Sequence, residues 1–389
     1  MQKKLIALAI AGLASTGAIA ETTYSIKGQV NIGIDQYKLG QGTALTAISG
    51  TEQRLSDQQS RLVFNADHTI GGNSKAWVTV DMRTSMDTNQ AGTTTYGLTA
   101  GNTGVGLMGD WGKLTVGRWE LHYNEGAVNE LSRVVISQAL GTNGMLSQVN
   151  GSVVAKGTRS DNVIMYDSAN LNGFTGRFAY STSPRGSEGT AVAPAVAGAA
   201  PIPLGNSGGG NAMTGALRYA AGPIKAGVSF YTEDSEDRRA NAPNTDQRGT
   251  RAYVGYTLPV GLSIGLTLDR SKYSAGTTTV TNPKWAERSA WLVPVKYASG
   301  PHGAYFAYGK ANSATGTGTV AGADSSAKFT KIGYDYALYK DTNVGVFYTK
   351  ISNAPAAKYN LFALASGQQT STLAGQSVSQ LYAGLSFSF

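Results

Sequence analysis

Hydrophobic and polar residues alternate with a period of two along much of the chain. At the C-terminus Leu381, Ala383, Leu385, Phe387 and Phe389 share one face, and tyrosine, glycine and serine occupy the positions between them. A β-strand places successive side chains on opposite faces, so this pattern predicts strands with one apolar and one polar face. The same alternation recurs over four further segments, 24–35, 61–67, 75–83 and 262–269.

Short turns and long polar stretches follow one another strictly between these segments. The short turns, rich in Gly, Pro, Asn and Asp, lie at 71–73, 110–112, 170–173, 221–223, 259–261, 299–301 and 339–341. The long stretches lie at 38–58, 84–103, 119–158, 184–211, 234–247, 273–284, 312–326 and 354–376. A soluble β-sandwich also alternates, but it has no reason to separate its connections by length in this way.

We therefore predict an all-β fold, a transmembrane antiparallel β-barrel of sixteen strands with short periplasmic turns and long extracellular loops. Pairing of the first and last strands would leave no exposed sheet edge. The predicted strands span 23–37, 59–69, 74–83, 104–110, 112–118, 159–168, 173–183, 212–221, 224–233, 248–258, 261–272, 285–298, 302–311, 327–338, 342–353 and 377–389.

The first twenty residues have the pattern of a secretory signal peptide. Lys3 and Lys4 precede an apolar stretch from Leu5 to Leu13, and Ala-Ile-Ala at 18–20 fits a cleavage site. The apolar stretch is shorter than the about 20 residues that a spanning helix needs. We expect residues 1–20 to be removed and residues 21–389 to form one barrel domain.

The composition is consistent with an exported membrane barrel and gives it a net positive charge. The chain has no cysteine, which excludes disulfide and thiol chemistry. Its 50 glycines, and 20 tyrosines against 10 phenylalanines, suit short strands and interfacial tyrosine belts. The full sequence has 32 basic and 24 acidic residues; without the two leader lysines the balance is 30 − 24 = +6.

If the apolar strand faces meet lipid, the opposite faces line a water-filled lumen. This parity points ten cations inward, namely Lys27, Arg61, Lys75, Arg83, Arg177, Arg218, Lys225, Arg251, Lys296 and Lys331. The inward carboxylates are Asp35, Asp67, Asp81, Asp167, Asp269 and Asp335. Because wall charge sets the local concentration of counter-ions, the excess of cations predicts a preference for anions. The alternative is a balanced lumen whose charges pair across it.

The third long loop, 119–158, is the predicted constriction of the pore. Acidic residues on this loop, facing arginines on the wall, would create a field across the narrowest point. Arg61 and Arg83 are the best wall candidates, whereas the parity of the preceding strand directs Arg118 outward unless the strand end breaks the alternation. The predicted pore-lining and constriction residues are Arg61, Arg83, Arg118, Arg133, Lys27, Lys75, Glu120, Glu125 and Glu130.

Several segments resemble one family along the whole chain. They are the hairpin GLMGDWGKLTVGR at 106–118, the strand-turn-strand NVIMYDSANLNGF at 162–174, Ser60-Arg61-Leu62, and the terminal Phe389. These segments are similar to Gram-negative general porins of β- and γ-proteobacteria, especially those of the Neisseria, Bordetella and Comamonas type. The resemblance implies a trimeric diffusion channel with sixteen strands and an inward third loop. Met165 and Ala169 depart from the family pattern, which often has a basic residue and a proline there.

The resemblance and the C-terminal strand also suggest partners and location. Leu385, Phe387 and Phe389 resemble the signal by which outer-membrane barrels are recognised by the assembly machinery. We expect a homotrimer in the outer membrane of a Gram-negative bacterium, in contact with lipid and with lipopolysaccharide phosphates. It would pass small ions and solutes, and we expect no nucleic acid, no cofactor and no metal.

Motifs of enzymes match the chain only superficially. Gly104–Gly109 fits a dinucleotide fingerprint and Gly261–Gly265 a nucleophile elbow, but neither leads from a strand into a helix. His68, His122 and His302 show no paired metal-ligand spacing. A barrel enzyme, a soluble exported β-protein and a substrate-selective channel remain alternatives. The last would need lumen aromatics, whereas the tyrosines here fall mostly on lipid-facing parity or at strand ends.

Overall fold

The computed structural model describes twelve stretches of the chain. These are residues 21–43, 49–58, 60–84, 86–87, 98–121, 145–154, 159–184, 210–235, 245–275, 284–318, 321–361 and 373–389. The predicted leader at 1–20 therefore lies outside the described residues. Within the described part of the chain, no helix is long and apolar enough to cross a membrane.

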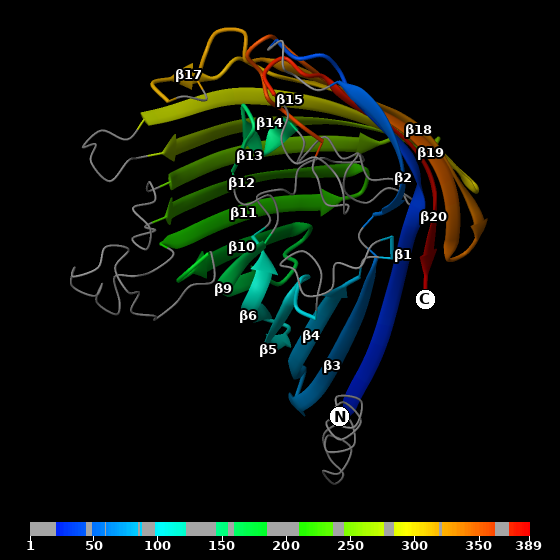
Figure 1. Ribbon diagram of the computed structural model, residues 1–389. Coiled ribbons are helices and arrows are strands. Elements are labelled where there is room, and N and C mark those ends of the chain that lie inside the picture. The colour runs from blue at the N-terminus through cyan, green and yellow to red at the C-terminus, as the bar shows by residue number, and fades with distance from the viewer. Residues whose placement is uncertain are drawn as a thin grey trace, which may run out of the picture.

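One antiparallel sheet closes on itself, and β20 pairs with β1 along eleven residue pairs from Gln29–Ser388 to Leu39–Val378 (Figure 1). In chain order the strands are β1 (Thr22–Leu39), β2 (Gly50–Asp57), β3 (Arg61–Gly71), β4 (Ser74–Arg83), β5 (Thr103–Gly109), β6 (Gly112–Glu120), β9 (Arg159–Ser168), β10 (Phe174–Ser181), β11 (Asn211–Ala221), β12 (Ile224–Ser235), β13 (Thr245–Thr257), β14 (Leu262–Ala275), β15 (Lys284–Ser299), β16 (His302–Ala311), β17 (Thr315–Gly316), β18 (Ala327–Tyr339), β19 (Thr342–Asn353) and β20 (Val378–Ser388).

The eighteen strands of this sheet occupy sixteen positions in the wall. Both β2 and β3 pair with β1 and together form one position, interrupted between Asp57 and Arg61. The two-residue β17 only extends the pairing of β15 beyond the end of β16. A separate hairpin of β7 (Gln148–Val149) and β8 (Ser152–Val153) lies inside the third loop. The predicted barrel of sixteen strands is confirmed.

The first long loop is shorter than the sequence predicted. Residues 50–57 were expected in a loop because Thr51, Glu52, Gln53 and Arg54 show no apolar alternation, yet they form β2. The reason is an ion pair on the lumen side, where Arg54 Nη2 lies 2.8 Å from Asp35 Oδ2 on β1. An ion pair between side chains thus stabilises the pairing of β1 and β2, where an alternating strand would use apolar contacts.

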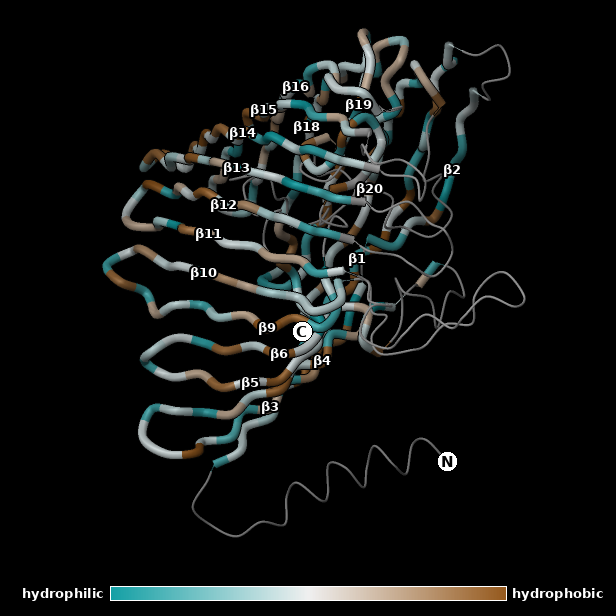
Figure 2. The backbone as a smooth tube through the Cα atoms, turned by 90° about the vertical axis from the view of Figure 1, so that its left-hand side faces the viewer, coloured by the Kyte–Doolittle hydropathy of each residue, from teal (hydrophilic) through white to brown (hydrophobic). Residues whose placement is uncertain are grey.

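The outward face of the wall carries exposed apolar side chains, including Ile26, Ile34, Leu217, Val228 and Ile332. Brown and teal positions accordingly intermingle along the strands in Figure 2. An apolar outer face is what a barrel surface in lipid requires, since the strands pair their backbone groups with one another.

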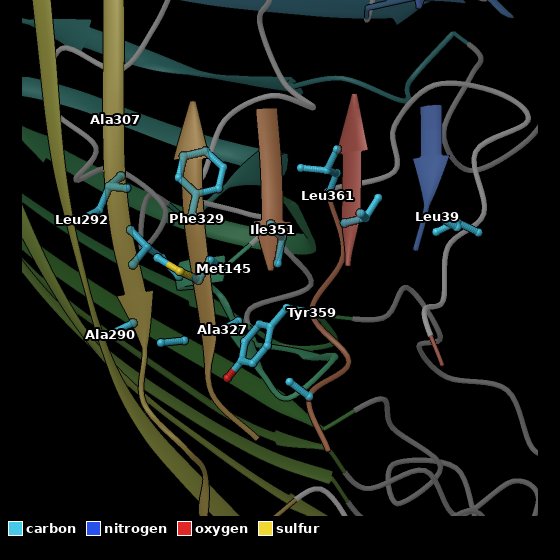
Figure 3. Packing of buried hydrophobic residues seen from close by; sticks show 14 of the residues in the cluster. Leu39, Met145, Ala290, Leu292, Ala307, Ala327, Phe329, Ile351, Tyr359 and Leu361 are labelled. Atoms are coloured by element: carbon cyan, nitrogen blue, oxygen red, sulfur yellow. The ribbon is translucent and has the colours of Figure 1, made fainter. Parts of the chain in front are cut away.

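At the long-loop end of the barrel several inward positions are occupied by apolar instead of polar residues. Leu39, Leu292, Phe329 and Ile351 lie on the inward faces of their strands and are buried. They contact segments of the third and eighth long loops that fold into the barrel mouth, as Figure 3 shows for Met145 and Tyr359. The rule that inward positions are polar is therefore wrong here, because folded loops rather than water cover these residues.

Glycines allow the first and last strands to approach closely. Gly33 and Gly384 are register partners across the closing seam, and the ring of Tyr382 lies over both. A Cβ on Gly33 would come within 2.6 Å of the Cα of Gly384 and would contact the Ala383 carbonyl oxygen more closely still. The seam therefore has no room for a side chain at this position.

We expect Gly33→Val to weaken closure of the barrel by about 1–3 kcal/mol, the usual cost of overpacking. The expected result is a lower temperature for the loss of the folded, fast-migrating band on an electrophoresis gel. Gly50→Val is the matched control, because Gly50 also lies in a strand but a Cβ there meets nothing within 4 Å. Equal thermal shifts for both variants would contradict this account of the seam.

Candidate pore constriction

Three arginines gather around Asp81 on one wall of the lumen. Arg61 and Arg83 are register partners on β3 and β4, and their guanidinium groups lie 3.9 and 3.0 Å from Asp81 Oδ2. Arg159, the first residue of β9, interacts electrostatically with both arginines and with Asp81 and Glu120. The Arg61 side chain keeps 24% of its surface exposed. We call these five residues the Asp81 cluster.

Asn102 holds the Asp81 cluster together from the start of β5. Its Oδ1 accepts hydrogen bonds from Arg159 Nε at 2.8 Å and from the Glu120 backbone N–H at 3.2 Å. Its own backbone N–H donates to Asp81 Oδ2 at 3.3 Å. One amide thus orients an arginine, a glutamate and an aspartate, and fixes the ends of three neighbouring strands.

A second cationic group lies further toward the short turns. Asp167 on β9 forms an ion pair with Arg177, and its Oδ1 lies 3.5 Å from Arg218 Nη2. Lys113 on β6 interacts electrostatically with Asp167 and Arg177. Glu120 acts electrostatically on Arg177 as well as on Arg61 and Arg83, so the two groups are coupled through it.

The predicted constriction residues fall into four sets. Arg61, Arg83 and Glu120 lie together in the Asp81 cluster, whereas Lys75 is eight residues along β4 from Arg83, about 26 Å in an extended strand. Lys27 lies on β1, two register positions from the pair Gln29–Arg61, and is exposed. Arg118 forms an ion pair with Asp161 next to an irregularity in the β6–β9 pairing. Arg133, Glu125 and Glu130 lie outside the described residues.

Arg159 and Arg288 were not among the predicted site residues. Arg159 stands at the end of a strand whose pairing shifts near Asn162, which has a φ of 54°, so alternation gives no direction there. Arg288 lies in a region where the inward face is partly apolar. Arg288 lies two residues from both Ala286 and Ala290, so its side chain points to the same inward face as theirs. This spacing was the one signal in the sequence for the direction of Arg288.

Some aromatic side chains line the lumen face, although many tyrosines are exposed on the outer surface, Tyr166, Tyr256 and Tyr334 for example. Trp77 and Trp119 meet edge to face with centroids 5.5 Å apart, and Lys113 Nζ lies 3.7 Å from the Trp77 ring centroid. Phe347 and Tyr382 are buried in a separate inward cluster. Such rings fit inside the wall because each lies across a glycine, Phe347 across Gly333 for example.

The end of the third loop is fixed to the opposite wall by a buried ionic triad. Asp269 on β14 accepts from Arg251 on β13, with Nη2–Oδ2 at 2.9 Å, and forms an ion pair with Arg288 on β15. All three side chains have no exposed surface. Breaking such a buried ion pair costs several kcal/mol of stability. The triad therefore forms a firmly held platform to which the loop can bind.

Loop residues 145–148 bind this platform through their backbone. Arg288 donates to the carbonyl oxygens of Met145 at 3.1 Å and Gln148 at 2.6 Å, and also to that of Leu146. Arg251 Nη2 donates to Ser147 Oγ at 3.1 Å. Because these loop residues are almost fully buried, the loop end lies inside the barrel and reduces its open section.

A closed antiparallel barrel, apolar outside and lined inside by clustered arginines and an inward loop, defines a membrane channel. Residues 7–355 match the family model of the Gram-negative porins. The chain belongs to this family, and it is an outer-membrane β-barrel that forms a diffusion channel. The sequence-based assignment to this family is confirmed.

Solved structures share the fold at low sequence identity. The chain is similar to the anion-selective porin of Comamonas acidovorans, with 18% identity, a TM-score of 0.71, and coverage of 95% of this chain and 100% of that one. OmpT of Vibrio cholerae aligns with 13% identity over 96% and 99% and a TM-score of 0.63. OmpF of Salmonella typhi aligns with 12% identity over 94% and 97% and a TM-score of 0.58. No curated protein matches the sequence.

Proposed function

We propose that the channel prefers anions and that the Asp81 cluster, with the third loop, is its constriction. The observation that carries this proposal is the gathering of Arg61, Arg83 and Arg159 on three strands around one aspartate. Placing like charges close together costs free energy. Three arginines gathered in this way are therefore best explained by a function, the attraction of anions that pass through the pore. The net charge of +6 after loss of the leader supports the same sign.

Glu120, the last residue of β6, contributes an acidic group to this constriction where the third loop begins, and the far end of that loop is held by the Asp269 triad on the opposite wall. Acidic groups facing arginines produce a transverse field, which orders a dipolar solute while it passes. Arg118 and the loop residues Arg133, Glu125 and Glu130 are proposed to complete the lining. Lys27 and Lys75 are proposed to extend the basic surface toward the short-turn rim.

Several further properties are proposed for the mature protein. Residues 1–20 are removed on export, and residues 21–389 form a single domain with its short turns in the periplasm. Three copies assemble into a trimer; the related OmpT of Vibrio cholerae has been described in a trimer form. Leu385, Phe387 and Phe389 serve as the assembly signal, and loop cations contact lipopolysaccharide phosphates. The channel carries out no catalysis and needs no cofactor or metal.

The selectivity is tested on the wild-type protein in a planar bilayer. We expect stepwise conductance and, in a KCl gradient, a reversal potential of the sign that chloride permeation produces. The preference should weaken with salt, since the Debye length falls from about 10 Å at 0.1 M to about 3 Å at 1 M. A potential that favours potassium would overturn the anion preference and leave the channel itself intact.

A further inference from the structure

The eighth long loop enters the barrel directly after β19. Ala357, Tyr359 and Leu361 are buried in one cluster with Met145 and Leu146 of the third loop. In Figure 3 the Met145 and Tyr359 side chains lie among wall residues of the same cluster, such as Leu292, Ala327 and Phe329. The two loops therefore share one apolar core inside the mouth of the barrel.

Asn150, at the tip of the β7–β8 hairpin, joins the two loops by a pair of hydrogen bonds. Its Nδ2 donates to the Ala356 carbonyl oxygen at 3.2 Å, and its Oδ1 accepts from the Lys358 backbone N–H at 2.8 Å. Gln148 Nε2 adds a longer bond to the Asn360 carbonyl oxygen at 3.4 Å. The Asn150 amide thus pairs with the backbone of residues 356–358 as a neighbouring strand would.

The position and backbone conformation of Asn150 suit this contact. It is only 6% exposed and has a left-handed backbone with a φ of 46°, which asparagine tolerates better than most residues. The next residue, Gly151, has a φ of 89°, and a Cβ there would lie 3.0 Å from the Lys358 carbonyl oxygen. The hairpin tip is therefore shaped to fit closely against the eighth loop.

The eighth loop is itself tied to the wall. Asn353, the last residue of β19, donates from Nδ2 to the carbonyl oxygens of Tyr359 at 2.7 Å and Gln376 at 2.6 Å, so it joins both arms of the loop. Tyr37 on β1 donates from its hydroxyl to Asn360 Oδ1 at 2.9 Å. Burial raises the pKa of the Tyr359 hydroxyl, which lies beside Arg288 and the Asn150 backbone.

We propose that residues 354–361 form a clamp that holds the third loop in its inward position, with Asn150 as the positioning residue. The Asp269 triad holds the base of the hairpin, and the clamp holds its tip. Without the clamp the tip would move in the lumen, and the open channel would close and reopen more often. The proposal rests on the channel function but not on its preference for anions.

The test is Asn150→Gly, which keeps the left-handed backbone and removes only the amide. Loss of two hydrogen bonds should raise the frequency of closing events under voltage about tenfold. The reversal potential in a KCl gradient should not change, so failure of the anion preference and failure of the clamp give different results. Asn172→Gly is the matched control, since Asn172 has a φ of 53° in an exposed short turn away from the clamp.

A second variant addresses the same contact from the other side. Asn353→Ala frees the eighth loop from β19, and we expect the same rise in closing events. The double variant should show little further rise in closing events, because both changes disrupt the same contact between the eighth loop and the third loop. Closing at the wild-type frequency in Asn150→Gly, an equal rise in Asn172→Gly, or additive effects of Asn150→Gly and Asn353→Ala would each overturn the clamp. Migration of the unheated protein as a folded barrel verifies each variant.

Discussion

Replacing Arg61 and Arg83 together with alanine is expected to lower the preference for chloride over potassium about fivefold at low salt. In water a unit charge about 8 Å from a passing ion contributes about 0.5 kcal/mol, which screening at about 0.1 M salt reduces to about 0.2 kcal/mol. Each charge then enriches chloride about 1.5-fold and depletes potassium by the same factor, so it changes their ratio slightly more than twofold. Two such charges give about fivefold, and Asp81 then faces the lumen with fewer cations beside it. The measurement is the reversal potential in a KCl gradient.

The matched control removes two cations of equal charge from the outside of the wall. Lys328 and Lys350 are exposed at the long-loop ends of β18 and β19, next to the inward-facing Phe329 and Ile351. Lys328→Ala with Lys350→Ala changes the net charge by the same amount without touching the lumen. If both double variants keep the wild-type potential, the constriction lies elsewhere; if both shift it equally, only net charge matters.

The barrel itself was predictable because its physical causes are local. Most strands alternate apolar and polar residues, and short turns differ clearly from long loops in the sequence, so the sixteen positions could be counted from the sequence alone. The inward direction of Arg61, Arg83 and Asp81 follows from the same alternation. Both predictions depend on local sequence alone and do not require knowledge of which residues contact one another across the lumen.

The loop contacts were not predictable for the opposite reason. Arg288 binds carbonyl oxygens at 145–148, about 140 residues away in sequence, and Asn150 binds residues 356–358 more than 200 residues away. Backbone acceptors leave no sequence signature, because every residue has one. Leu292 and Phe329 gave a misleading signal, since apolar inward residues look like lipid-facing ones until the covering loop is known.

The buried position of Arg288 gives it a larger role than its charge alone suggests. Its guanidinium fills a planar site between Asp269 and three loop carbonyl oxygens. Only arginine offers five donors in such a fixed fork. In its absence those carbonyl oxygens stay buried without this donor, and each unpaired group costs about 1–3 kcal/mol. The third loop would then gain more from moving into water than from staying docked.

Arg288→Ala is therefore expected to weaken docking of the third loop by about 3–5 kcal/mol. Chymotrypsin should cut the loop after Leu146, which is fully buried in the docked loop, at least about 100-fold faster, because cleavage follows the population of the opened form. Fragment masses from the folded barrel give the rate and the site. Arg270→Ala is the control, because that side chain is 73% exposed and forms an ion pair with Glu287 across the outer surface. Such exposed pairs contribute about 0–1 kcal/mol, so its cleavage rate should match wild type. Unchanged chymotrypsin resistance in Arg288→Ala would mean that the clamp at 354–361 holds the loop without the triad.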